Sequence, residues 1–169
     1  SFRVRITRLV IRADSFPRLR ALNVRNTQVR SIVCLRHCPL LEDLDCDYTP
    51  LRDLEGLQAC ARLRKLRCAF THVWSLSPLM ELTELREVSV HHTKVASLLP
   101  LRRCRALRAL RAGHTCLPTL HGLERCADMV ALECAQWAPQ LECVRLLERC
   151  AALRAININI ESRLRAYSR

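Results

Sequence analysis

Histidine and cysteine side chains are the first candidates for chemistry, because imidazole and thiolate are the ligands that zinc prefers. The group that could gather at one edge of the molecule is His72, His92, His114 and Cys116. Structural zinc sites, however, use tight local pairs such as C-x2-C with H-x3-5-H. Cys34 and Cys38 come nearest to that spacing, but the positions equivalent to Cys38 include Phe16 and Leu82, which bind no metal. We therefore expect neither a metal nor a cofactor.

Motifs for catalysis are the second candidates, and the sequence contains none of the common ones. It has no G-x-S-x-G, no P-loop and no H-E-x-x-H. The three glycines, Gly56, Gly113 and Gly122, stand alone, so they form no phosphate-binding loop. No cysteine has neighbours that would mark it as an activated nucleophile. We expect a protein that binds a partner, is not an enzyme and has no small-molecule substrate.

Arginine suggests a third kind of chemistry, the neutralisation of phosphate. The formal net charge is +12, and only Lys65 and Lys94 among the 28 basic residues are lysines. The densest run of arginines comprises Arg102, Arg103, Arg105, Arg108 and Arg111. Such a run could contact an RNA backbone. Because no RNA-reading motif and no interleaved aromatic residues accompany it, we favour a solvated basic face.

An internal repeat with a period of 22 residues must position all of these side chains. Apolar residues recur at that spacing in several columns. The first column is Leu19, Leu41, Leu63, Leu85, Leu107 and Met129. A threonine column runs without exception through Thr27, Thr49, Thr71, Thr93 and Thr115. So many aligned columns indicate stacked turns that bury a continuous core.

Each repeat is predicted to contain one strand and one return segment. Apolar residues alternate in stretches such as 22–24, as a half-buried strand requires. Before each return segment stands a short polar residue that can accept hydrogen bonds from the amides opening a short helix. These capping residues are Ser31, Asp53, Ser75, Ser97 and Thr119. The last turn is two residues longer, with the insertion within 135–139, and a seventh strand is expected over 153–158.

The composite unit L-x-x-L-x-(V/C)-x-x-T-x-(V/L)-x-(S/D)-L-x-x-L-x-x-C resembles the leucine-rich repeat, specifically its 22-residue internalin-like class. The resemblance covers essentially residues 1–169. It implies a single α/β solenoid domain of about seven repeats, with parallel strands on a concave face and short α or 3-10 segments on the convex face. The arginine run from Arg102 to Arg111 is expected on the convex side. Family members usually carry Asn where this chain has Thr, and we expect a threonine ladder that serves the same turn. Neither end shows a polar capping repeat, so we expect a fragment of a longer chain.

Charged side chains on the expected concave face form the first candidate binding surface. An acidic strand with Asp43, Asp45 and Asp47 lies beside a basic strand with Lys65 and Arg67. These charges either serve a partner or pair with one another across strands. Such pairs are worth only about 0.2–1 kcal/mol each, so pairing is an equally good explanation.

Ring-bearing residues just after four successive strands form the second candidate surface. They are Tyr48, Phe70, His92 and His114. Trp74 lies three residues past Thr71 and could extend this rim. Aromatic side chains are favoured anchors at interfaces, so this rim is the best candidate site. The alternative is that Tyr48 and Phe70 fold down over the strand ends as part of the core edge.

The cysteine content bears on the compartment in which the protein works. The 11 cysteines form an odd number and fall at inward-facing repeat positions, where a free thiol serves as a small buried hydrophobe. We therefore expect a reducing intracellular compartment, cytoplasmic or mitochondrial. No apolar run approaches the roughly 20 residues of a membrane span. The leading hypothesis is a scaffold that binds another protein on its concave face and rim; the alternative is a ribonucleoprotein component whose arginines contact RNA.

Overall fold

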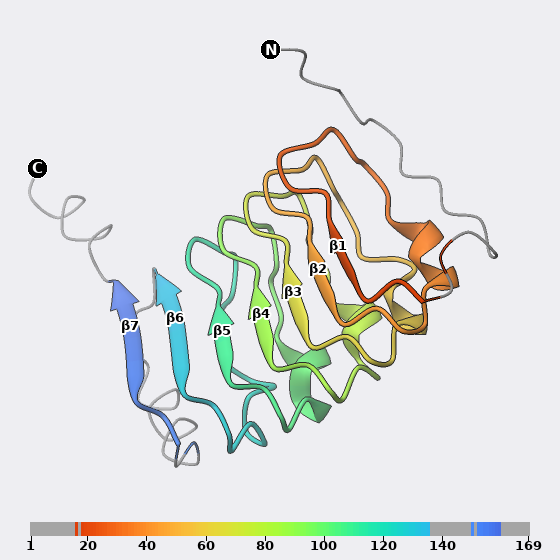
Figure 1. The fold of residues 1–169 in the computed structure, drawn as a ribbon. Coiled ribbons are helices and arrows are strands. Elements are labelled where there is room, and N and C mark those ends of the chain that lie inside the picture. The colour runs from red at the N-terminus through yellow and green to blue at the C-terminus, as the bar shows by residue number, and fades with distance from the viewer. Residues whose placement is uncertain (1–15, 17, 136–149, 151, 160–169) are drawn as a thin grey trace, which may run out of the picture.

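The computed structural model describes residues 16, 18–135, 150 and 152–159, and within these residues the chain forms one open sheet of seven parallel strands. The strands lie side by side in chain order (Figure 1). Their bounds are β1 (Ala21–Asn23), β2 (Asp43–Asp45), β3 (Lys65–Arg67), β4 (Glu87–Ser89), β5 (Ala109–Arg111), β6 (Ala131–Ala135) and β7 (Ala155–Asn159). The surface formed by their outward side chains, which the sequence predicts to be concave, is called the strand face below.

The register of the sheet follows the repeat. Ala21 of β1 pairs with Asp43 of β2. In each following pair of strands up to β5 and β6, paired residues are likewise 22 positions apart. Between β6 and β7 the offset becomes 24, because Ala131 pairs with Ala155. This confirms the predicted two-residue insertion in the last turn, although its expected position within 135–139 lies almost wholly outside the described residues. The seventh strand is also confirmed.

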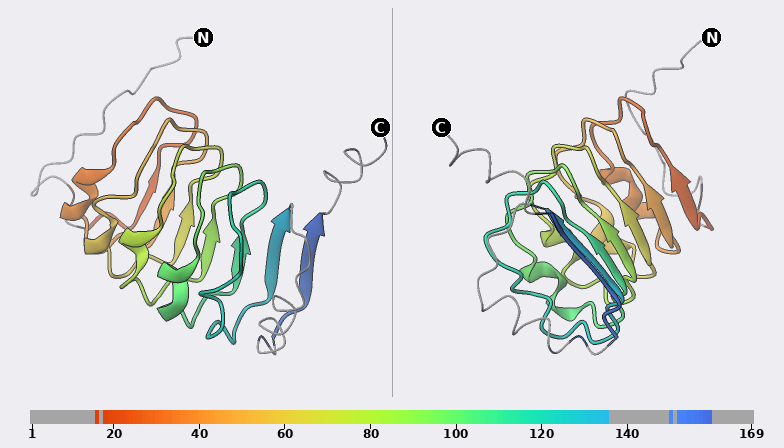
Figure 2. Two further views of the ribbon diagram at one scale, coloured as in Figure 1. Left: turned by 180° about the vertical axis from the view of Figure 1, so that it is seen from behind. Right: turned by 90° about the vertical axis from the view of Figure 1, so that its left-hand side faces the viewer.

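The return segments contain short 3-10 helices on the side of the coil away from the strands (Figure 2). Their bounds are η1 (Val33–His37), η2 (Leu57–Ala59), η3 (Ser77–Leu79) and η4 (Leu99–Arg103). The capping prediction is confirmed in three turns: Ser97 accepts a hydrogen bond from the first amide of η4, at Leu99, over 3.2 Å, and Ser31 and Ser75 accept those of η1 and η3. Asp53 and Thr119 accept the amides of Glu55 and His121 at the same repeat positions, where no described helix begins. Short 3-10 turns let each coil close within 22 residues.

The core is the stack of the apolar columns. In the Leu22 column, the residues of β2 to β6 are all buried, and Leu22 itself, at the edge of the sheet, is only partly buried. Buried cysteines fill two further columns, as predicted for inward-facing thiols. Burial raises the pKa of Cys60 and of Cys126 to about 12, and that of Cys104 to about 11. The Cys104 thiol donates to the carbonyl of Leu82 in the preceding turn, over 3.4 Å.

The threonine column closes the bend after each strand. Thr49 donates its hydroxyl hydrogen to the carbonyl of Cys46, three residues earlier, over 2.7 Å. Thr27, Thr71, Thr93 and Thr115 make the same bond in their turns. Each hydroxyl therefore bonds within its own turn, and the column is a series of local bonds rather than a chain of bonds from turn to turn. In the part of the chain that the structure describes, no helix has the length and apolar character needed to cross a membrane.

Candidate functional site

A continuous stack of four rings stands at the carboxyl ends of β2 to β5. The ring centroids of Tyr48 and Phe70 are 4.4 Å apart, those of Phe70 and His92 4.3 Å, and those of His92 and His114 4.2 Å. The planes deviate from parallel by only 9°, 13° and 17° in the same order. The stacked rings Tyr48, Phe70, His92 and His114 are called the ring column below. Neighbouring strands lie about 4.8 Å apart, so the sheet brings the four rings within stacking distance.

The ring column is exposed. Tyr48 is 45% and Phe70 38% accessible, and His92 and His114 are exposed as well. Tyr48 and Phe70 therefore do not fold into the core edge, which was the alternative reading of the sequence. Stacking partners cover the ring faces inside the column, so the side presented to solvent is largely a row of ring edges.

The backbone under the ring column is in the left-handed region. Tyr48, Phe70, His92 and His114 have φ of 55°, 54°, 52° and 52°, and the equivalent Asn26 in the first described turn has 56°. Gly adopts this conformation most readily and Asn, Asp and His are enriched in it, whereas a bulky residue such as Tyr or Phe there is an outlier. Such conformations cost on the order of 1 kcal/mol or more per residue, and they collect at functional sites. Tyr48 and Phe70 are thus held where the bend itself favours Gly, Asn, Asp or His.

Two further residues extend the ring column. The guanidinium of Arg25 lies 4.9 Å from the ring centre of Tyr48, in a cation–π contact at one end of the stack. His91 meets Phe70 edge-on, with centroids 5.0 Å apart and planes at 83°, and accepts or donates a 3.0 Å hydrogen bond between its Nδ1 and the Ser89 hydroxyl. Neither residue was singled out as a site residue from the sequence. The signal was present, since both occupy the column directly before the ring column.

The two adjacent histidines favour their neutral forms. Burial is the largest cause that lowers the pKa of His91, where carboxylates at Asp47 and Glu133 act in the opposite direction. Burial also lowers the pKa of His92, followed by the nearby His114 and His91. The unfolded chain therefore binds more protons than the folded chain once the pH falls below the ordinary histidine value of about 6.5.

We accordingly expect the free energy of unfolding to fall as the pH is lowered from about 7.5 to 5.5, with the loss beginning near the unfolded pKa. Urea unfolding at the two pH values measures this. The double variant His91→Ala/His92→Asn, which uses the residue types found at Ala69 and Asn26, should show a smaller loss. His72→Gln, outside the ring column, should keep the full loss. An unchanged pH dependence in the double variant would contradict the assignment.

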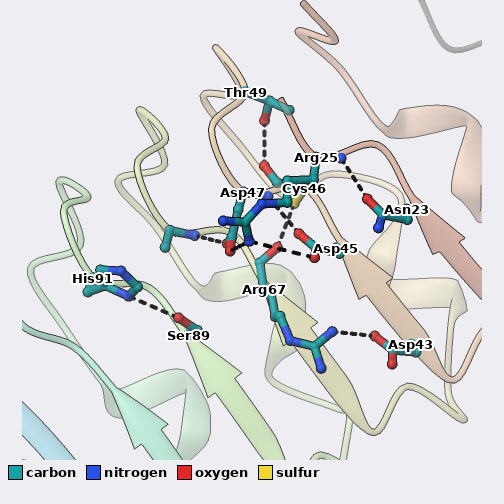
Figure 3. A network of polar contacts seen from close by, with 11 residues as sticks. Asn23, Arg25, Asp43, Asp45, Cys46, Asp47, Thr49, Arg67, Ser89 and His91 are labelled. Atoms are coloured by element: carbon teal, nitrogen blue, oxygen red, sulfur yellow. Dashed lines mark hydrogen bonds and ion pairs between the residues drawn. The ribbon is translucent and has the colours of Figure 1, made fainter. Parts of the chain in front are cut away.

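Charges on the strand face are paired with one another. Arg67 contacts Asp43 at 3.1 Å and Arg25 contacts Asp47 at 2.8 Å (Figure 3). Lys65 contacts Glu87 at 3.0 Å. Of these pairs, Arg67–Asp43 joins the acidic and the basic strand, which is the cross-strand pairing that one of the two interpretations of the sequence expected. Lys65, however, pairs with β4 rather than with the acidic strand. The charged side chains named here therefore form ion pairs with one another within the chain.

Asp47 is a structural residue more than a surface charge. It is only 6% exposed; its Oδ2 binds Arg25 and its Oδ1 accepts the backbone amide of Ala69 over 2.7 Å. The amide is part of the next turn, so Asp47 joins two turns at the foot of the ring column (Figure 3). Asp45, the last residue of β2, accepts the amide of Asp47 over 3.1 Å. The sequence placed Asp47 on the acidic strand with Asp43 and Asp45, but β2 ends at Asp45, and the burial of Asp47 was not predicted.

Asp47→Ala should lower the free energy of unfolding by about 1–3 kcal/mol, because the buried amide of Ala69 loses its acceptor. Alanine fits sterically, since Ala69 holds the equivalent position in the next turn. Asp43→Ala removes a carboxylate that is 38% exposed in its ion pair, and should cost less than about 1 kcal/mol. Chemical denaturation of both variants tests the difference. Equal losses would show that the bond to Ala69 has no special weight.

The arginine run divides between two surfaces. Arg102 and Arg103 lie on η4, and Arg103 is paired with Glu81 of the preceding turn. Arg111 ends β5 and contacts Glu133 at 3.6 Å on the strand face, so its predicted place on the convex side is wrong. Arg108 precedes β5, and Arg105 lies exposed between the two elements. The run follows the chain from one face toward the other instead of forming one patch.

Trp74 does not extend the ring column. It is 63% exposed and lines a separate hollow with Met80, Leu99 and Arg102. The spacing of three residues after Thr71 therefore did not predict the surroundings of Trp74. Among the described residues, no three or more His, Cys, Asp or Glu side chains are arranged to hold a metal ion.

Comparison with solved structures identifies this architecture. Internalin C2 of Listeria monocytogenes aligns with a TM-score of 0.79 at 15% identity, over 95% of this chain and 72% of its own. The protein has the leucine-rich-repeat fold. The Listeria monocytogenes internalin inlF aligns with the solenoid at a TM-score of 0.64 and 16% identity, over 89% of the solenoid and 50% of itself, so the chain spans half the length of that protein.

A plant receptor shares the same architecture. The peptide hormone receptor RGFR1, solved in complex with RGF2, aligns with the solenoid at a TM-score of 0.72 and 14% identity, over 90% of the solenoid and 27% of the receptor. At the level of sequence, no family model and no curated protein matches the solenoid. The similarity is thus one of fold.

Proposed function

We propose that the solenoid is a non-catalytic module that binds another protein through the ring column and the adjoining strand face, in a reducing intracellular compartment. The observation that carries this proposal is the ring column itself: four exposed rings stacked at 4.2–4.4 Å on backbone positions that favour Asn. Folding alone gives no reason for Tyr48 and Phe70 there, because Asn26 closes the same bend without a ring. Aromatic and cationic side chains that are already fixed in place lose little conformational entropy on binding.

The strand face beside the ring column supports the same proposal. Its ion pairs hold the side chains in a fixed arrangement, which gives a partner a preorganised polar surface next to the exposed rings. Beyond β4, the outward positions Ala109 and Ala131 are small, so a partner's backbone could approach closely. Curved repeat surfaces are suited to this use, and the plant receptor with the same fold was solved with RGF2 bound.

Arginine contacts to RNA are the alternative function. The division of the run between η4 and the strand face, and the ion pairs of Arg103 and Arg111, favour the protein-binding proposal. One experiment compares the two. The full chain is used to capture partners from lysate at low and moderately high salt, with and without RNase, and the same capture is repeated with two sets of variants.

The first variant is Tyr48→Asn/Phe70→Asn, which removes two rings but retains the residue type that Asn26 shows to fit the bend. We expect at least a tenfold loss of the captured protein, because central aromatic anchors contribute on the order of 2 kcal/mol each. The second variant, Arg103→Glu/Arg105→Glu/Arg108→Glu, changes exposed arginines of the run and should bind as the parent does. Partner capture that survives the first variant would contradict the ring-column proposal. Capture that disappears with RNase or with the second variant would favour the RNA alternative.

A further inference from the structure

A second surface feature lies on the return segments, away from the ring column. Three large apolar side chains are exposed there: Trp74 at 63%, Met80 at 39% and Leu99 at 54%. They line one open hollow of about 490 Å³, which also includes Pro100 and Arg102. A cluster of this kind on the surface of a soluble domain marks an interaction site more often than chance exposure of single residues does.

The hollow lies between corresponding segments of two adjacent turns. Residues 74–80 and 96–102 are one repeat apart, and they contain η3 and η4. Trp74 is followed one repeat later by Ala96, so the large indole has a small neighbour and space remains beside it. The hollow is therefore a consequence of which side chains occupy these two turns, not of the repeat geometry.

Two of the three apolar residues of the hollow, Trp74 and Met80, depart from the pattern of the two preceding turns. The position of Trp74 holds arginine in the two preceding repeats, at Arg30 and Arg52. The position of Met80 holds Arg36 and Gln58 there. Because those turns fold with polar side chains at the same places, folding does not require apolar ones. The tryptophan and methionine at this site need another explanation, and contact with a partner supplies it.

The edge of the hollow is polar and cationic. Ser75 and Ser97 are engaged in capping the amides of Ser77 and Leu99. Arg102 is exposed and, among the described residues, takes part in no ion pair, whereas the adjacent Arg103 is bound to Glu81. The hollow thus combines an apolar floor with a guanidinium available at its rim, in a chain of net charge +12.

We propose that this hollow is a second docking site, which takes a bulky apolar side chain of a protein partner while Arg102 binds a carboxylate next to that side chain. The apolar group would pack on Trp74, Met80 and Leu99. An acidic and hydrophobic segment is the complement of this surface, because the guanidinium binds carboxylates with charge-assisted hydrogen bonds. The site is independent of the ring column and of the partner proposed for it.

A pair of small probes tests the proposal on the whole chain. 4-Phenylbutyrate supplies an apolar ring and a carboxylate, and 4-phenylbutanamide is its uncharged match. The methyl resonance of Met80 reports on the hollow, and the buried methyl of Met129 is the internal control. We expect both probes to shift the Met80 signal at concentrations on the order of 10 mM or below, with the acid binding roughly two- to fivefold more tightly. Met129 should not respond.

Two variants separate the apolar and ionic contributions. Arg102→Gln should make the acid and the amide bind equally. Trp74→Arg restores the residue type of the two preceding turns and should abolish the response of Met80 to both probes. Tyr48→Asn/Phe70→Asn, which alters only the ring column, should leave both responses intact. The proposal is overturned if neither probe shifts Met80 or if Arg102→Gln keeps the preference for the acid.

Discussion

Gly122→Ala is expected to lower the free energy of unfolding by about 3 kcal/mol or more. Gly122 has a φ of 114°, which an L-residue with a side chain rarely adopts. A Cβ atom at this position would lie 2.2 Å from the carbonyl oxygen of Leu98 and 2.8 Å from the amide nitrogen of Leu99. Both atoms are backbone of the preceding turn, so no side chain can move aside. Chemical denaturation of the purified variant measures the loss.

The chain supplies a matched control for this glycine. Gly113→Ala changes a glycine whose equivalents in earlier turns are Arg25, Asp47, Ala69 and His91, so the bend accepts a side chain there. We expect this variant to stay within about 1 kcal/mol of the parent. Gly56→Ala, where the closest backbone atoms would be 2.8 Å from the Cβ, should fall near Gly122→Ala. Similar stability of all three variants would refute the role of close backbone approach.

Leu66→Ala is expected to cost about 2–5 kcal/mol. Leu66 is the central residue of β3, is fully buried, and pairs with Leu44 on one side and Val88 on the other. Its removal leaves a cavity between two neighbouring turns, and in a solenoid each turn is stabilised almost only by its neighbours. The midpoint and slope of urea unfolding measure the effect.

Leu22→Ala is the control for that prediction, because it makes the same chemical change in the same column. Leu22 lies on β1 at the edge of the sheet and is only partly buried, so less apolar surface and fewer contacts are lost. We expect its cost to be well under half that of Leu66→Ala. If the two substitutions cost the same free energy of unfolding, the greater burial of Leu66 inside the stack would not determine its contribution to stability.

Surface details show where sequence reasoning was incomplete. The pattern placed Asp47 on the acidic strand but did not reveal its burial or its bond to the amide of Ala69. It placed Arg111 on the convex side, although this residue ends β5 and contacts Glu133. Long charged side chains have several neighbours within reach, and the alternative pairs differ by less than about 1 kcal/mol, so spacing alone does not choose among them.

The ring column was predicted in part. Its four members were found from the sequence, because one residue per turn at a fixed position must line up when the turns stack. The parallel orientation of the rings, their centroid distances of 4.2–4.4 Å and the left-handed backbone beneath them appeared only in the structure. Whether the rings bind a partner stays a prediction for the experiments above.

The amino-acid sequence by itself determined the repeat period, the register of the strands, the two-residue insertion before β7 and the membership of the core, because burial of apolar residues at a fixed spacing is a one-dimensional signal. Tertiary structure alone decided which charges pair. It also decided that Trp74 lines the hollow with Met80 and Leu99 instead of extending the ring column, and that Gly122 lies against the backbone of the preceding turn. These features depend on distances between atoms of neighbouring turns, and such distances are set by the packing of the whole coil rather than by any one repeat.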